Sequence, residues 1–88
     1  MYLIEFTESA REDLLLLQKK EPQAINKVKA LLTEIAEHPR TGTGKVERLK
    51  HYKNETWSRR ITREHRLVYE IHENQILVLV ISSFGHYI

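Results

Sequence analysis

The chain has 88 residues, of which 41% are hydrophobic and 30% charged, with a formal net charge of +2 and no cysteine. This length predicts one domain, residues 1–88, around a modest core. The lack of cysteine excludes disulfides and thiolate zinc sites. No stretch approaches the ~20 apolar residues of a membrane-spanning helix, and the first residues do not resemble a signal peptide. We therefore expect a cytoplasmic protein that has no membrane partner.

The positive charge is concentrated in the middle of the chain. Residues 45–66 hold eight lysines and arginines but only three glutamates, a net +5, whereas the remaining residues sum to −3. A basic segment in an otherwise slightly acidic chain indicates a local anionic partner such as a phosphate backbone. A solvated charged face explains the charge alone equally well.

The start of the chain predicts a strand followed by a helix. Residues 2–6 are apolar at alternate positions, as in a short strand. The helix then runs to about Lys20, with residues 14–17 on its buried side. We expect Thr7 or Ser9 to cap its N-terminus. Ser9–Glu12 has the pattern of a capping box, in which the residue at each end satisfies the free backbone amide of the other.

A second helix is predicted from Glu21–Pro22, since proline is accommodated in a first helical turn. It continues to about His38, where Pro39 and the glycine-containing residues 41–44 end it and form a loop. Two helices with a short joint make a helical hairpin. Apolar residues recur in the second helix at helical spacing, namely Ile25, Val28, Leu31, Leu32 and Ile35.

The second half of the chain changes to a period of two and predicts four strands, at residues 46–50, 56–62, 67–72 and 76–84. Their connections are short, with a turn at Glu73–Asn74, so we expect antiparallel pairing. The predicted fold is α+β: a small antiparallel open sheet with the N-terminal helical hairpin packed on one face.

Strand parity predicts that two arginines lie on the sheet face that the helices do not cover. Arg60 and Arg66 each point away from the apolar side chains of their own strands. A guanidinium on an uncovered sheet face suits the planar, bidentate binding of phosphate. Glu47 shares its parity with Leu49, so parity does not place it on that face.

Four short motifs follow one another in the second half of the sequence: Glu47–His51, Trp57–Thr62, Glu64–Tyr69 and His86–Tyr87. Together, in a chain of this length and element order, they resemble the YoeB (Txe) toxins of the RelE/ParE superfamily, which belong to type II toxin–antitoxin modules. The resemblance implies the RelE-like form of the fold predicted above. It also implies ribosome-dependent endonucleolytic cleavage of messenger RNA in the aminoacyl (A) site, which halts translation.

The resemblance further implies catalytic roles for four residues. Glu47 becomes the general base, His86 the general acid, Arg66 the group that stabilises the transition state, and Tyr87 a supporting residue. A carboxylate and an imidazole, here Glu47 and His86, can transfer protons while the RNA 2′-hydroxyl attacks the adjacent phosphate. Neither a cofactor nor a metal is therefore needed. Nearby Lys50 and Arg66 favour the ionised carboxylate of Glu47, which leaves open whether Glu47 or His86 is the base.

Further basic residues are predicted to bind RNA or the ribosome. Lys50 and Arg60 match positions that the family uses for these contacts, and neighbouring Lys45 and Arg59 complete the set. No metal site is expected, because His51, His65 and His86 lack the spacing of a ligand set.

The partners implied by the resemblance are messenger RNA, the 70S ribosome and an acidic antitoxin of the YefM/Phd type. Ala10 stands where some relatives carry a larger aromatic residue, so it stays open whether a homodimer forms. One alternative is an inactive relative that binds nucleic acid or antitoxin without cutting. Another is an interaction module whose sheet face docks a second chain. Retention of all four catalytic residues favours the active enzyme.

Overall fold

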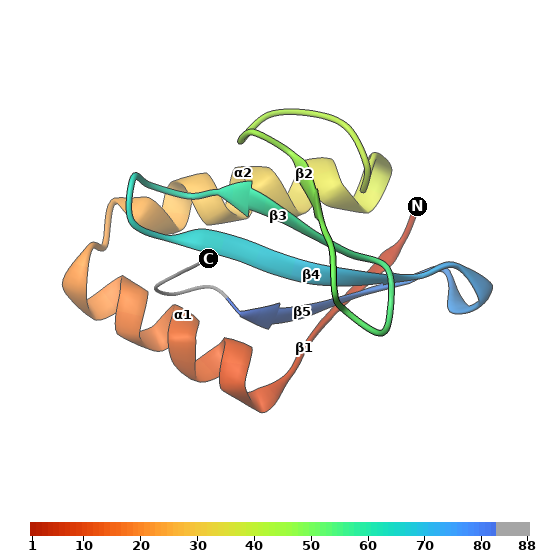
Figure 1. Cartoon of the computed structure of the whole chain (residues 1–88). Coiled ribbons are helices and arrows are strands. Elements are labelled where there is room, and N and C mark those ends of the chain that lie inside the picture. Colours follow the sequence, from red (N-terminus) through yellow and green to blue (C-terminus); the bar gives the residue numbers. More distant parts are fainter. Residues whose placement is uncertain (83–88) are drawn as a thin grey trace.

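The computed structural model describes residues 1–82 and shows two helices beside a five-stranded sheet (Figure 1). This arrangement confirms the predicted α+β fold with its helical hairpin. The elements in chain order are β1 (Leu3–Phe6), α1 (Glu8–Lys20), α2 (Ala24–Glu37), β2 (Glu47–Leu49), β3 (Thr56–Arg60), β4 (Arg66–His72), the single 3₁₀ turn η1 (Glu73–Gln75) and β5 (Leu77–Ser82).

The strands lie in the order β1-β5-β4-β3-β2. The last four pair antiparallel, as the short connections predicted. β1 instead pairs parallel with β5, with Leu3 opposite Leu77, so the sheet is mixed and not wholly antiparallel. A short turn forces antiparallel pairing only between consecutive strands. It places no constraint on two strands that come from the opposite ends of the described chain.

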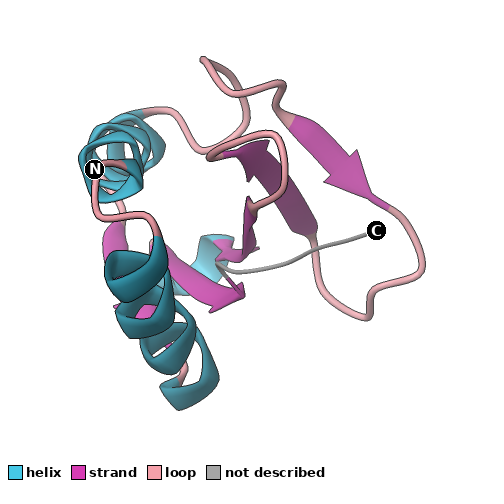
Figure 2. Ribbon diagram, turned by 90° about the vertical axis from the view of Figure 1, so that its left-hand side faces the viewer, coloured by secondary structure: helices cyan, strands magenta, loops and turns pink. Residues whose placement is uncertain are grey.

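Both helices pack against the same face of the sheet (Figure 2). The opposite face, which we call the helix-free face, carries the other half of each strand's side chains. Neither helix among residues 1–82 combines the length and apolar character that crossing a membrane requires. The core between helices and sheet is formed by Leu17, Val28, Leu31 and Ile35 from the helices and by Leu67, Tyr69, Ile71, Val78 and Val80 from the sheet.

The N-terminus of α1 is capped by Thr7. Its hydroxyl accepts a hydrogen bond from the backbone N–H of Ala10 at 3.0 Å. Ser9 already lies inside the first helical turn and is exposed, so the predicted capping box at Ser9 is wrong. A capping residue needs an extended backbone conformation, which Thr7 has and which the chain leaves at Glu8.

The apolar run in α1 is only partly buried. Leu17 has no exposed surface, but Leu15 is 67% exposed and Leu16 38% exposed. Consecutive helical residues point about 100° apart, so four neighbouring leucines cannot all face one sheet. The prediction that residues 14–17 together form the buried side was therefore wrong for these two positions.

Replacing Thr7 with alanine should lower the free energy of unfolding by about 1 kcal/mol, because one amide of the first turn loses its acceptor. Ser9→Ala also removes a hydroxyl, but from an exposed position inside the helix. It should change the free energy of unfolding by less than about 0.5 kcal/mol. Urea denaturation of both variants measures the difference. An equal loss for Ser9→Ala would contradict the assignment of the cap.

Candidate functional site

Strand register brings four polar residues together on the helix-free face. Glu47 of β2 lies opposite Ser58 of β3, and Arg60 of β3 lies opposite Arg66 of β4. Directly opposed residues of antiparallel strands project to the same side of a sheet. The two arginines therefore lie where parity predicted, and Glu47 joins them. Sequence parity missed Glu47 because apolar Leu49 shares its face.

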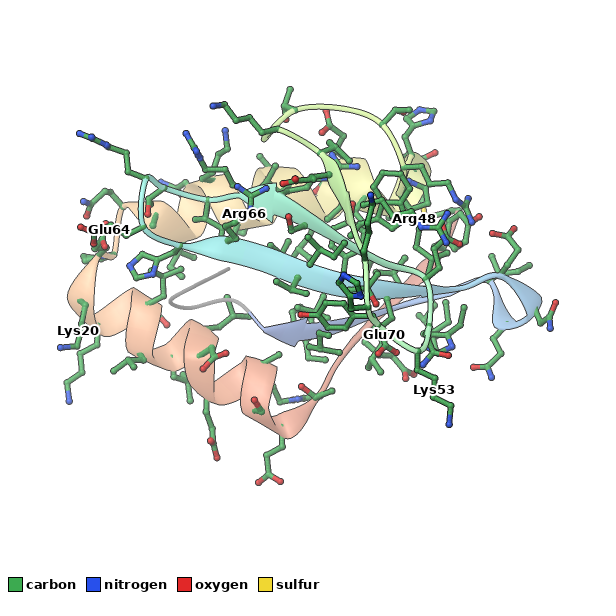
Figure 3. All side chains as sticks on the ribbon, in the orientation of Figure 1. Lys20, Arg48, Lys53, Glu64, Arg66 and Glu70 are labelled. Atoms are coloured by element: carbon green, nitrogen blue, oxygen red, sulfur yellow. The ribbon has the colours of Figure 1, made fainter. Side chains whose placement is uncertain are left out.

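Arg66 is held at the centre of this group. Its Nε and Nη2 both donate to the hydroxyl of Ser58, at 3.0 and 2.8 Å, and Nη2 also donates to the backbone carbonyl of Lys45 at 3.2 Å. The carboxylate of Glu47 lies 3.8 Å from Nη2. The Arg66 side chain, labelled in Figure 3, is 21% exposed, and that of Glu47 is 67% exposed, so both groups are accessible to solvent. Ser58 was not singled out from the sequence, although it shares parity with Arg60.

Exposed basic residues flank Glu47 on both sides. Lys45 precedes β2 with a left-handed backbone (φ +51°), and Lys50 follows directly after β2; both side chains are exposed. The end of β2 and the loop that follows it, residues 48–55, line a hollow of about 390 Å³. Tyr52 in this loop is 49% exposed, so an aromatic ring is available beside the basic residues.

Arg59 is the exception among the predicted RNA-binding residues. Its side chain has no exposed surface and turns toward the helices, where it contacts Tyr69 and Glu34. A fully buried side chain cannot contact RNA, so this prediction was wrong. Strand parity could have predicted this burial. Arg59 is adjacent to Arg60 in the strand, so it points to the opposite face, which is the helix-facing side that Trp57 shares.

Glu34, near the end of α2, is the carboxylate that faces Arg59. Thr43 donates its backbone N–H to Glu34 Oε1 at 2.8 Å and its hydroxyl at 3.0 Å, and Arg59 Nη1 donates at 2.5 Å. The Thr43 amide above all, helped by the Thr43 hydroxyl and Arg59, holds the pKa of Glu34 below its ordinary value against the opposing effect of desolvation. Burial raises the pKa of Tyr69, although the Arg59 guanidinium opposes this shift.

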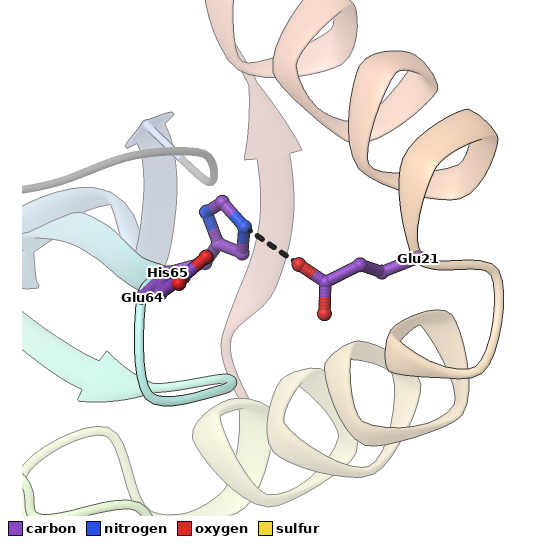
Figure 4. A group of neighbouring side chains, drawn as sticks. All are labelled: Glu21, Glu64 and His65. Atoms are coloured by element: carbon purple, nitrogen blue, oxygen red, sulfur yellow. Dashed lines mark hydrogen bonds and ion pairs between the residues drawn. The ribbon is translucent and has the colours of Figure 1, made fainter.

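Three side chains that could share a metal ion meet at the α1–α2 joint and the β3–β4 turn (Figure 4). Their nearest ligand atoms, from Glu21, Glu64 and His65, all lie within 4.8 Å of one another, and His65 Nε2 is 3.0 Å from Glu21. His65 is buried on the helix side, whereas Arg66 points to the helix-free face. This group is therefore separate from the candidate site.

His86 and Tyr87 lie outside the described residues. Their predicted roles as general acid and supporting residue remain predictions.

Comparison with known proteins identifies the family. Residues 6–87 match the family described as YoeB-like toxin of bacterial type II toxin-antitoxin system. The chain belongs to the YoeB toxin family. A YoeB toxin from Synechocystis is 40% identical over 84 residues, which cover 96% of this chain and 95% of the relative.

Solved structures of YoeB toxins share the fold. The YoeB/ParE toxin from Agrobacterium tumefaciens superposes with a TM-score of 0.87 at 33% identity, covering 97% of this chain and 99% of that one. YoeB from Staphylococcus aureus has been solved as a dimer, with a TM-score of 0.84, 34% identity and 98% coverage of both chains. It has also been solved in a heterotetrameric complex with YefM, with a TM-score of 0.81, 33% identity and 99% coverage of both chains.

The Glu34 carboxylate should make stability depend on pH. A carboxylate whose pKa is lowered by folding stabilises the folded state above its unfolded pKa and loses that effect as the pH falls through the lowered value. Wild type should therefore exceed Glu34→Gln in free energy of unfolding at pH 7, and the difference should shrink between about pH 5 and about pH 3. Urea denaturation across this range tests it. A difference that grows on acidification would contradict the ionised contact.

Proposed function

We propose that this YoeB-family toxin is a ribosome-dependent endoribonuclease that cuts messenger RNA in the A site and thereby inhibits translation. The observation that carries the proposal is the placement of Arg66 beside Glu47 on the helix-free face, with Nη2 3.8 Å from the carboxylate. The Arg66 guanidinium, which can bind phosphate, and the Glu47 carboxylate, which can accept a proton, then lie within reach of one phosphodiester. Site, fold and family all agree with this chemistry.

The proposed reaction needs no external nucleophile. A base, Glu47 or His86, removes the proton of the RNA 2′-hydroxyl, and the oxygen attacks the adjacent phosphorus. The bond from phosphorus to the 5′-oxygen breaks, and an acid protonates the departing oxygen. This acid is His86 if Glu47 is the base. The products are a 2′,3′-cyclic phosphate and a free 5′-hydroxyl, and no metal or other cofactor takes part.

Arg66 is suited to stabilise the charge that develops on the non-bridging oxygens. Within residues 1–82 its hydrogen bonds run from Nε and Nη2 to Ser58 and Lys45, so the two N–H groups of Nη1 remain for phosphate. Ser58 fixes the plane of the guanidinium before substrate arrives. A preoriented donor stabilises a transition state without reorganising during the reaction.

The remaining basic residues extend the contact along the nucleic acid. Lys45 and Lys50 are exposed on either side of Glu47, and Arg60 is half-buried opposite Arg66. Their charges attract the phosphate backbone of messenger and ribosomal RNA without reading its sequence. A protein that acts on ribosomes works in the cytoplasm, and we propose that location for the chain as a single toxin domain.

We also propose an acidic antitoxin of the YefM type as partner, because YoeB from Staphylococcus aureus has been solved in complex with YefM. The basic residues of the helix-free face offer the complementary charge. The same relative has been solved as a dimer, and we propose that this chain can also pair with itself. Light scattering of the isolated chain and of its antitoxin complex distinguishes the two assemblies.

Purified toxin on programmed bacterial ribosomes should cut messenger within the A-site codon, as mapped by primer extension. Glu47→Gln and His86→Ala should each lower the rate by about 10²–10⁴-fold, because each removes a group that transfers a proton. Arg66→Lys should also be strongly impaired, since lysine cannot reproduce the fork. The matched control is Arg63→Lys at an exposed position of the β3–β4 turn, which should cut at the wild-type rate.

Absence of cleavage by folded, antitoxin-free wild type would exclude the active nuclease. The alternative is then a catalytically inactive relative that only binds RNA or antitoxin. That alternative predicts RNA binding that Arg66→Lys weakens and Glu47→Gln leaves unchanged.

A further inference from the structure

We infer that Arg59 is a positioning residue for the proposed cleavage: from the helix side of the sheet it holds the loop of residues 38–45, and thereby sets Glu47 beside Arg66. The inference rests on the proposed function. Arg59 itself touches neither RNA nor the reacting atoms, because its side chain has no exposed surface.

The Arg59 guanidinium is enclosed by acceptors from the loop. Nη2 donates to the backbone carbonyls of His38 at 2.7 Å and Thr41 at 2.8 Å, and Nη1 donates to the carbonyl of Thr43 at 3.4 Å. One side chain therefore bonds to three carbonyls spread over six consecutive residues. These carbonyls take part in neither helix nor sheet, so Arg59 supplies bonds that regular structure does not.

Two further groups hold the guanidinium in place. Nη1 donates to the Glu34 carboxylate at 2.5 Å, and the same carboxylate oxygen accepts the N–H and the hydroxyl of Thr43. Nε donates to the hydroxyl of Tyr69 at 3.0 Å, and that hydroxyl donates to the carbonyl of Pro39 at 2.7 Å. The loop is thus bonded to α2, β3 and β4 through one cluster of groups.

The loop can close around Arg59 only because of its glycines. Gly42 has φ +133° and Gly44 has φ +92°, values that residues with side chains rarely adopt. A Cβ on Gly42 would collide with the Glu34 carboxylate and with Nη1 of Arg59, so the loop packs directly on the ion pair. Any side chain at this position must displace part of the cluster.

The held loop leads directly into the candidate site. The carbonyl of Gly44 accepts the backbone N–H of Arg60 at 2.6 Å, and the carbonyl of Lys45 accepts Nη2 of Arg66 at 3.2 Å. Glu47 follows two residues later and begins β2. Movement of the loop would therefore change the geometry of Glu47 and Arg66 together, and a displacement of about 1 Å at reacting groups can lower a rate by ~10²-fold.

Arginine is specifically suited to this role. Its planar guanidinium offers five N–H donors in a fixed fork, whereas a lysine ammonium offers three from one atom. Arg59→Lys keeps the positive charge opposite Glu34 but cannot reach the carbonyls of His38, Thr41 and Thr43 together. The substitution thus separates the charge from the positioning.

The test compares wild type with Arg59→Lys in ribosome-dependent messenger cleavage under steady-state conditions. We expect kcat to fall by roughly 10–100-fold while KM changes by less than about threefold, because the residues that contact RNA are intact and only their alignment is lost. Arg11→Lys makes the same chemical change at an exposed position of α1 and should leave both constants unchanged. A folded Arg59→Lys with wild-type kcat would overturn the inference.

Gly42→Ala provides a second route to the same geometry with Arg59 still present, and it carries the test if Arg59→Lys does not fold. It should also lower kcat more than it changes KM. Amide hydrogen exchange of residues 43–47, measured without ribosomes, should accelerate in both variants. Either unchanged exchange or wild-type kcat in the folded variants overturns the inference. An inactive wild type overturns the proposed function, and the exchange data then decide whether Arg59 holds the loop.

Discussion

The buried Arg59 guanidinium and its ring of acceptors are the interaction on which the site depends. The charge is removed from water, which is costly unless each donor finds an acceptor. Here the acceptors are the Glu34 carboxylate, the Tyr69 hydroxyl and the carbonyls of a loop that has no regular structure of its own. One side chain thereby holds the loop of residues 38–45 in one conformation, although the loop forms no helix or strand that would constrain it.

β3 serves two systems at once because its side chains alternate. Arg59 points to the helices and fixes the loop, while Ser58 and Arg60 point to the helix-free face and line the candidate site. The same alternation on β4 directs Tyr69 inward and Arg66 outward. Two adjacent arginines of one motif thus have different physical roles. A substitution in this motif acts on the placement of the loop or on the candidate site, according to which face of the sheet it changes.

The sequence predicted most of the fold because its patterns are local. Period-two strands, the helical spacing of α2 and the loop glycines all reflect backbone geometry within a few residues. The parallel pairing of β1 depends on contacts between distant segments, which no local pattern reports. In the site, parity placed Arg60 and Arg66 correctly. It did not place Glu47, because β2 has only three residues and an apolar neighbour on the same face. Arg59 was wrongly predicted to bind RNA because the prediction rested on its charge. Its position next to Arg60 in the strand places its side chain on the opposite face.

The parallel pair at the edge of the sheet has a consequence for how the protein is made. β5 lies between β1 and β4, so the first strand has no neighbour until the last described strand is present, with Leu3 opposite Leu77. Contacts of such long sequence separation slow folding. During synthesis β1 therefore has no strand to pair with until β5 has left the ribosomal tunnel, and the core side chains of β5, Val78 and Val80, are added last among the described strands. Completion of the sheet is thus tied to the synthesis of β5.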